Sequence, residues 1–243
     1  MIPKIIHYCW FGRGEKPKLV KKCIASWKKY CPDYEIVEWN EDNFDLNMNG
    51  YTRMCYAEKK YAYLSDYVRL YVVNQHGGIY FDTDVELVRN PDFLLENIAF
   101  FGFETGHDPV SKPECTANTG LAFGSVASGL ALAAMLKEYE PLLDGKHGVK
   151  GCPELNTRAL VTLGLKRDGS YQELDCATIY PKEYFNPYES STGRLVKTEN
   201  TVSIHWYMGS ALTGAQKFRS RITRPFHRLF GEDCFRWLKK KSR

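Results

Sequence analysis

The segment Phe81-Asp82-Thr83-Asp84-Val85 places two carboxylates two residues apart, directly after a short apolar run. In extended backbone, residues i and i+2 point to the same side, so we expect Asp82 and Asp84 to face one way. Two carboxylates directed into one small volume repel each other, and a divalent cation that prefers oxygen ligands, Mg²⁺ or Mn²⁺, relieves that repulsion. The pattern therefore favours a metal site, and two solvated aspartates at a strand end are the alternative.

This acidic pair has little specificity by itself. The chain contains twelve Asp, so an Asp-x-Asp triplet is expected about 0.6 times by chance. Its position adds weight, because an apolar residue recurs on a helical period from Met54 to His76 and Gly77-Gly78 ends that period. Residues 79–85 then read as one strand that carries the pair, and the pair lies where a strand emerges at the ligand edge of an α/β sheet.

The elements around the pair predict such a sheet. Residues 4–11 read as a buried strand, a helix runs from Pro17 to near Pro32, and residues 34–39 alternate as a second strand, which together begin a parallel α/β sheet. Further strands are expected at 98–103, 120–123, 177–180 and 201–206, and further helices near 130–139 and 154–163. We predict one domain over residues 1–215, followed by a C-terminal appendage, residues 216–243.

Composition excludes several classes of protein. The 243 residues are 44% hydrophobic and 26% charged, which is typical of a globular chain rather than a disordered one. No apolar run approaches the ~20 residues that span a bilayer, and the first residues do not read as a signal peptide. Eight cysteines without a Cys-x-x-Cys pair favour reduced thiols, so a cytoplasmic location is expected.

Charge is distributed unevenly along the chain. Residues 217–243 contain ten Lys or Arg against Glu232 and Asp233, a local charge of +8; the whole chain carries +4, so residues 1–216 carry −4. Apolar residues recur in this tail at spacings of three and four, which predicts basic amphipathic helices suited to an anionic membrane surface. A helix packed on the body is the alternative, and the acidic body disfavours nucleic acid as a partner.

Several ordered motifs resemble one family. Residues 65–71 and 77–84 are similar to the S-D-x-x-R and G-G-x-Y-x-D-x-D block of retaining DxD sugar transferases of the GT32 type. That group includes initiating α-mannosyltransferases, capsular-polysaccharide transferases and glucosylating clostridial toxins. Residues 2–12, 34–40 and 181–187 also resemble its motifs, so the agreement extends, with gaps, from residue 2 to about residue 210.

The resemblance implies an α/β fold of the GT-A type with a mainly parallel sheet, a divalent metal and a nucleotide-diphosphate sugar, with UDP-hexose favoured over GDP-mannose. It also implies transfer with retention to an oligosaccharide or lipid-linked acceptor, in capsule or cell-surface synthesis at the inner face of the membrane. Because an imidazole joins the expected carboxylate ligands, Mn²⁺ is favoured over Mg²⁺.

The resemblance also assigns roles to individual residues. Donor binding is expected of Trp10, which would stack on the base, and of Ser65, Asp66, Arg69, Tyr80, Asp82 and Ser210. The expected metal ligands are Asp82, Asp84 and His205, and the expected catalytic residues are Asp82, Asp84 and Asn118.

This chain departs from the family in its late motif. His205-Trp206-Tyr207-Met208-Gly209-Ser210-Ala211 has its tryptophan one place early and alanine at the final aromatic position, which removes the expected indole contact to the diphosphate unless Lys217 replaces it.

Each assignment has a structural alternative. Trp10 can close a core, Asp66 and Arg69 can form an exposed helical ion pair, and His205 can be a buried structural histidine, as we expect of His7. Two rival functions also remain open: a nucleotide-sugar hydrolase or nucleotidyl transferase with the same metal site, and a non-catalytic membrane-binding module that acts through its tail.

Overall fold

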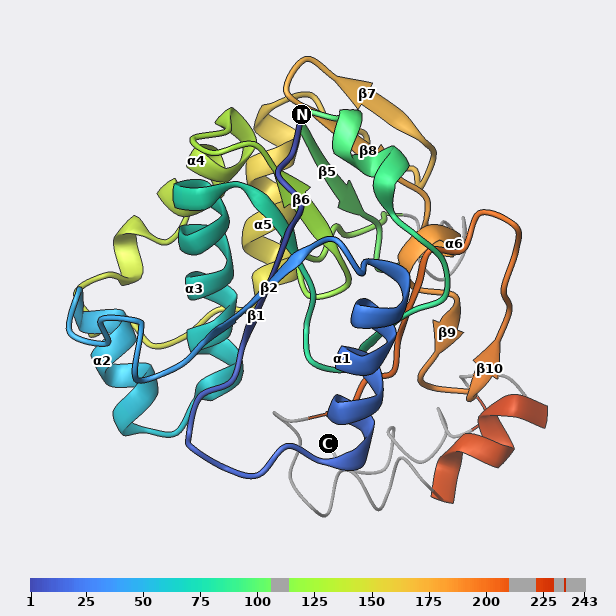
Figure 1. Cartoon of the computed structure of the whole chain (residues 1–243), viewed down its shortest axis with the longest axis horizontal. Coiled ribbons are helices and arrows are strands. Elements are labelled where there is room, and N and C mark those ends of the chain that lie inside the picture. Colours follow the sequence, from blue (N-terminus) through green and yellow to red (C-terminus); the bar gives the residue numbers. More distant parts are fainter. Residues whose placement is uncertain (106–113, 210–221, 230–233, 235–243) are drawn as a thin grey trace.

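The computed structural model describes residues 1–105, 114–209, 222–229 and 234. A seven-stranded sheet forms its centre (Figure 1). The strands, in spatial order, are β2 (Glu35–Trp39), β1 (Ile5–Cys9), β3 (Gly78–Tyr80), β6 (Phe123–Ser125), β5 (Ala99–Gly102), β8 (Ala177–Tyr180) and β7 (Gln172–Leu174). Parallel pairing joins β2, β1 and β3, and also β5 and β8, whereas β6 and β7 run antiparallel to their neighbours. This mixed, mostly parallel α/β sheet confirms the expected fold class.

Helices cover both faces of this sheet. Those of the described residues are α1 (Lys18–Tyr30), α2 (Gly50–Ala57), α3 (Tyr61–His76), α4 (Leu130–Lys137), α5 (Cys152–Thr162), α6 (Lys182–Phe185), the 3-10 turns η1 (Asp92–Glu96) and η2 (Glu140–Leu142), and residues 222–229. One core cluster packs α3, α4 and α5 against the sheet, and a second packs α1 against the opposite face through Cys23 and Trp27. None of the described helices is long and apolar enough to cross a bilayer.

Burial on both faces explains why the strands of the central sheet appear in the sequence as continuous apolar runs. Residues 6–9 of β1 are all buried, because β1 lies between two strands with a helical layer on each side. The helix–strand order alternates over the first eighty residues, so the first parallel strands are joined by α1 and by α2 with α3.

Several predicted boundaries were wrong. The helical period from 54 to 76 is divided between α2 and α3, because the chain leaves the helix at Glu58 and Lys59 has a left-handed φ of 56°. The strand expected at 120–123 begins only at Phe123, since the preceding residues form a turn. The strand expected at 201–206 is β11 (Ser203–His205), which belongs to a separate two-stranded sheet with β4 (Val85–Leu87).

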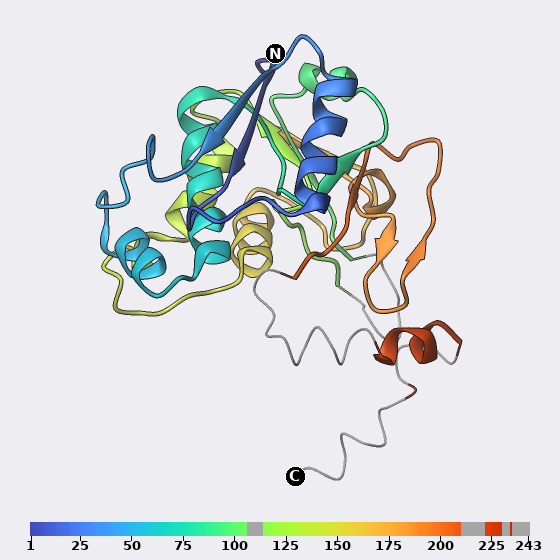
Figure 2. The ribbon, with the colours of Figure 1, turned by 60° about the horizontal axis from the view of Figure 1, so that its bottom comes forward.

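The C-terminal appendage is described only at residues 222–229 and 234. Helix 222–229 lies beside the hairpin of β9 (Tyr188–Glu189) and β10 (Arg194–Leu195), as Figures 1 and 2 both show. The Arg224 side chain provides the contact, since a Cβ added at Gly193 would lie 2.9 Å from Arg224 Cδ. The domain boundary near residue 215 lies outside the described residues and stays a prediction.

Candidate active site

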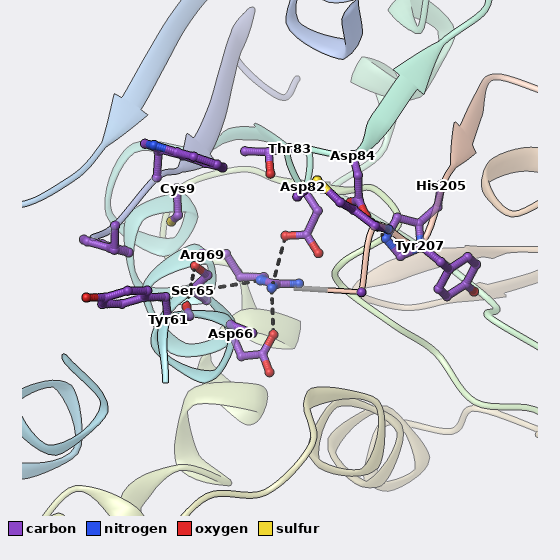
Figure 3. A pocket seen from close by; sticks show the side chains of 15 residues that line it. Cys9, Tyr61, Ser65, Asp66, Arg69, Asp82, Thr83, Asp84, His205 and Tyr207 are labelled. Atoms are coloured by element: carbon purple, nitrogen blue, oxygen red, sulfur yellow. Dashed lines mark hydrogen bonds and ion pairs between the residues drawn. The ribbon is translucent and has the colours of Figure 1, made fainter. Parts of the chain in front are cut away.

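A cavity of about 340 Å³ opens where the chain leaves β1 and β3 at the edge of the sheet. Ligands of α/β proteins bind at this edge because parallel strands deliver their following loops to one place. The cavity is lined by Cys9, Trp10, Phe11, Tyr61, Ala62, Ser65, Asp66, Arg69, Asp82, Thr83, Asp84, His205, Tyr207, Met208 and Gly209. Figure 3 shows many of these side chains converging from α3, the 82–84 turn and the segment after β11.

The acidic pair lies in a turn, so the strand predicted across 79–85 was wrong. The chain leaves the central sheet after β3 and enters the small sheet at β4, and residues 81–84 make that crossing. The backbone N–H of Val85 donates to the carbonyl of Asp82 at 3.0 Å and closes the turn. Both carboxylates and Thr83 line the cavity, so the convergence of Asp82 and Asp84 comes from the turn and not from extended alternation.

Asp82, Asp84 and His205 could hold a metal ion together. Each offers a ligand atom, and these atoms lie within 4.8 Å of one another. His205 Nε2 lies 3.1 Å from Asp84 Oδ1, while Asp84 Oδ2 accepts the backbone N–H of Met208 at 2.7 Å. Two carboxylates and one imidazole form a donor set that suits a divalent transition metal, so the residues fit such an ion.

The charges of these three residues are strongly coupled. Burial alone would raise the pKa of Asp84, but the nearby His205 and the hydrogen bonds outweigh it and the pKa is lowered. Burial likewise opposes the charged form of His205, yet Asp84 raises its pKa above the ordinary value. For Asp82, burial dominates over the attraction of Arg69 and raises the pKa to about 6.

Arg69 is the centre of a buried polar network. Its Nη2 lies 2.6 Å from Asp66 Oδ1 and 3.2 Å from Asp82 Oδ1, and its Nε donates to the carbonyl of Ser65 at 3.1 Å (Figure 3). The guanidinium lies 5.0 Å from the centre of the Tyr80 ring. Arg69 is only 3% exposed and Asp66 9%, so the alternative of an exposed helical pair was wrong. Arg69 Nη1 has no partner among the described residues.

Two predicted site residues lie behind the cavity wall. Tyr80 is 1% exposed and its hydroxyl donates to Asp82 Oδ1 at 3.1 Å, so it positions a cavity residue and does not itself line the cavity. Asn118 is also buried; its Oδ1 accepts the backbone N–H of Gly120 at 2.7 Å and faces Cys152 Sγ at 3.3 Å. Both residues are therefore one layer removed from a ligand in the cavity.

Gly120 lies against two cavity residues without lining the cavity itself, and the sequence did not indicate it. A Cβ at this position would lie 2.6 Å from Asp82 Oδ2, 2.9 Å from Arg69 Nη1 and 3.1 Å from Asn118 Oδ1. A Cβ here would displace these side-chain atoms, so glycine preserves the arrangement of the three polar groups. One glycine in a loop carries no spacing signal that would have revealed this.

Trp10 and Ser65 both line the cavity. Trp10 is half-buried, its Nε1 donates to the carbonyl of Gly14 at 2.7 Å, and its ring is thus held at the rim and not in a closed core. The Ser65 hydroxyl donates to the carbonyl of Tyr61 at 2.9 Å. Ser210, like Lys217, lies outside the described residues.

In the segment after β11, the aromatic residue that lines the cavity is Tyr207 and not Trp206. Trp206 does not line the cavity, because its Nε1 donates to Glu86 Oε2 at 2.8 Å on the outer side. Tyr207 lines it instead, with its ring centre 4.1 Å from that of His205 and a left-handed φ of 49°. A bulky residue with positive φ is strained, and such strain is frequent at functional sites. The sequence does not reveal this conformation.

His7 is placed as expected. It is 1% exposed in the middle of β1, its Nε2 lies 2.8 Å from the carbonyl of Gly77, and its Nδ1 accepts the indole N–H of Trp39 at 3.1 Å. It does not line the cavity.

Fold and site together define an α/β protein with a cavity at the sheet edge that brings together three carboxylates, one arginine and one histidine. Residues 17–101 match the family model described as the glycosyltransferase sugar-binding region containing a DXD motif, and this segment includes Asp66, Arg69, Asp82 and Asp84. A curated relative, inositol phosphoceramide mannosyltransferase 3 of Schizosaccharomyces pombe, is 35% identical over 101 residues, which are 39% of this chain and 27% of that protein. The match thus spans about a quarter of the relative's length.

Solved glycosyltransferase structures align with this chain. The PaToxG glycosyltransferase aligns with a TM-score of 0.51 and 20% identity over 66% of this chain and 69% of that one. A glycosyltransferase involved in the glycosylation of the major capsid of PBCV-1 aligns with a TM-score of 0.44 and 11% identity, over 90% of this chain and 100% of that one. The PaToxG alignment supports a fold of the GT-A type.

Proposed function

We propose that this chain is a metal-dependent retaining glycosyltransferase of the GT32 type, which moves a hexose from a nucleotide-diphosphate sugar, with UDP-hexose favoured, to a glycan acceptor. One observation carries the proposal: within a segment that matches a DXD sugar-binding region, Asp82, Asp84 and His205 converge on a cavity that also holds the buried cation Arg69. We further propose that the product belongs to a capsular or other cell-surface polysaccharide.

Asp82, Asp84 and His205 would hold the metal, for which we favour Mn²⁺ over Mg²⁺ because an imidazole is present. When bound, such an ion neutralises negative charge on the diphosphate leaving group. Asp84 is fixed for this role by the Met208 N–H, which leaves its Oδ1 directed toward His205.

Arg69 would stabilise the leaving diphosphate from the protein side. Its guanidinium is already oriented by Asp66, Asp82 and the Ser65 carbonyl, so little reorganisation is needed as charge develops. The two carboxylates keep it protonated despite burial, since they raise its pKa well above the usual value. In this scheme Asp66 accepts hydrogen bonds from hydroxyl groups of the donor sugar, and Trp10 stacks on the base of the nucleotide.

Retention requires that the acceptor oxygen arrive on the face that the diphosphate leaves. Among the described residues that line the cavity, the acidic ones are Asp66, Asp82 and Asp84, and all three already bind Arg69 or His205. We therefore propose front-side attack: the acceptor oxygen bonds to the anomeric carbon as the carbon–oxygen bond to the diphosphate breaks, and a phosphate oxygen takes the acceptor proton. A covalent glycosyl adduct, detected by intact-mass spectrometry with a slow donor, would contradict this route.

The C-terminal segment supports a membrane-bound acceptor. In helix 222–229, Ile222 is 50% exposed and Leu229 75%, and Arg228 is exposed beside them, whereas Arg224 packs against the β9–β10 hairpin. Exposed apolar residues with basic neighbours suit an anionic lipid surface. We propose that the protein acts on a lipid-linked acceptor at the cytoplasmic face of the membrane. Deleting residues 217–243 should weaken co-sedimentation with anionic vesicles and spare transfer to a soluble acceptor; unchanged sedimentation would refute the membrane role.

A donor panel tests the proposal as a whole. The protein is incubated with UDP- and GDP-sugars and Mn²⁺, and released nucleoside diphosphate is measured with and without oligosaccharide or lipid-linked glycan. Acceptor-stimulated, metal-dependent release supports transfer. Release that no acceptor stimulates supports the nucleotide-sugar hydrolase, cleavage to a nucleoside monophosphate supports nucleotidyl transfer, and no turnover supports the non-catalytic membrane module.

A further inference from the structure

A second cavity, of about 480 Å³, lies one hydrogen bond away from the candidate active site. Asn186 belongs to its wall, and the Asn186 Nδ2 donates to the Tyr207 hydroxyl at 2.6 Å and to the Glu104 carbonyl at 2.8 Å. Tyr207 in turn lines the active-site cavity beside His205. One buried amide thus joins the walls of the two cavities.

The second cavity carries charges of both signs. Lys182, at the start of α6, and Arg194, in β10, provide two cations, for which the described residues offer no ion-pair partner. Glu183 and Glu189 provide two carboxylates. Each carboxylate accepts one hydrogen bond from a neighbour, Glu183 Oε1 from Asn200 Nδ2 at 2.6 Å and Glu189 Oε2 from the Thr192 hydroxyl.

This set of groups selects among ligand classes. The charges of the four side chains cancel, so an anionic ligand would meet two carboxylates and an apolar one would leave four charged groups desolvated. A neutral sugar fits better, because each of its hydroxyls donates one hydrogen bond and accepts up to two. A volume of about 480 Å³ lies in the range of small-molecule sites.

We infer that this cavity binds saccharide units of the acceptor glycan. The inference rests on the proposed function, since a transferase must hold its acceptor beside the donor. Tyr207 lies where the two cavities meet, and its hydroxyl accepts the side-chain N–H of Asn186. The β9–β10 hairpin, which forms part of the cavity wall, also packs against helix 222–229 through Arg224, so a glycan leaving the cavity would emerge next to that helix.

Direct binding tests the site without catalysis. Saturation-transfer NMR is recorded with methyl glycosides and disaccharides of glucose, galactose and mannose, in the absence of a nucleotide sugar. One saccharide that binds the wild type is then tested on the double variant Lys182→Ala/Arg194→Ala. Its affinity for this variant should be at least about tenfold weaker. Lys197→Ala is the matched control, because Lys197 is an exposed residue of the same segment that does not line the cavity. Thermal unfolding shows whether the variants remain folded.

Two results would overturn the inference: no saccharide of the panel binds the wild type, or the double variant binds as well as Lys197→Ala. Donor hydrolysis with Mn²⁺ and no acceptor tests the proposed function separately. It should survive in the double variant, whereas the KM for the acceptor rises by at least about tenfold at unchanged donor KM. Saccharide binding without any turnover in the wild type would refute transfer while the cavity remains a sugar site.

Discussion

Replacing Asp84 by Asn separates charge from shape at the candidate metal site. The amide is isosteric with the carboxylate and keeps an oxygen that can accept the Met208 N–H, now 2.7 Å from Asp84 Oδ2. The variant loses the charge that faces His205 Nε2 at 3.1 Å. Burial then lowers the pKa of His205 without opposition from Asp84, while Asp82 and Glu104 still raise it, so the charged imidazole is less favoured than in the wild type and the cost of an unpaired buried charge is reduced.

The cost in stability is therefore modest and the cost in activity large. Loss of one charge-assisted hydrogen bond corresponds to about 1–3 kcal/mol of unfolding free energy. At about 2–4 °C per kcal/mol for a chain of this size, Tm should fall by about 2–12 °C. Because a neutral amide binds a divalent ion weakly, turnover should fall by at least about a hundredfold.

The assay measures nucleoside diphosphate release at saturating donor over a range of Mn²⁺ concentrations, with Tm measured in parallel. Asp175→Asn provides the same chemical change at an exposed position outside the cavity and should leave both quantities unchanged. Retention of about a tenth or more of wild-type turnover by Asp84→Asn at saturating Mn²⁺ would refute the ligand role.

Three further outcomes are expected. Gly120→Ala places a Cβ 2.6 Å from Asp82 Oδ2, so turnover should fall at least about tenfold. Gly14→Ala is the control and should be neutral, because a Cβ at that position meets nothing within 4 Å. Equal activities of the two variants would show that the loop around Gly120 adapts to the added methyl group. Burial lowers the pKa of His7 from 6.5 to about 4, so the unfolded state binds a proton first as the pH falls below 6.5. Between pH 6.5 and 4, the unfolding free energy of the wild type, measured by denaturant titration, should therefore fall by about 3 kcal/mol more than that of His7→Gln. Parallel pH curves for the two proteins would contradict this. Treatment with EDTA should abolish diphosphate release and Mn²⁺ should restore it, whereas full activity after chelation would exclude a metal role.

The sequence predicted the parts of the site that depend on local spacing. Asp66 and Arg69 are three residues apart on one helix and do pair, at 2.6 Å, because that spacing brings side chains together on any α-helix. The acidic pair after Gly77-Gly78 was correctly placed at the sheet edge, since a buried apolar strand must be followed by a turn there. The α/β fold followed from the alternation of apolar runs with helical periods.

Local reasoning was insufficient where the chain changes from one sheet to another. Residues 79–85 read as one strand, yet they contribute to two sheets. Residues 79–80 belong to β3 in the central sheet, whereas Val85 begins β4, which pairs with β11 from more than a hundred residues away. No window of the sequence contains both partners, so the crossing at 81–84 could not be predicted.

The sequence by itself determined the fold class, the acidic pair and the helical pair, because each depends on the order or spacing of residues that are near one another in the chain. Tertiary structure alone decided that Arg69 is buried between two carboxylates, that Gly120 lies against Asp82, and that Tyr207 and Asn186 join two cavities. These contacts bring together segments far apart in the chain, and their energies depend on burial, which only the packed molecule defines.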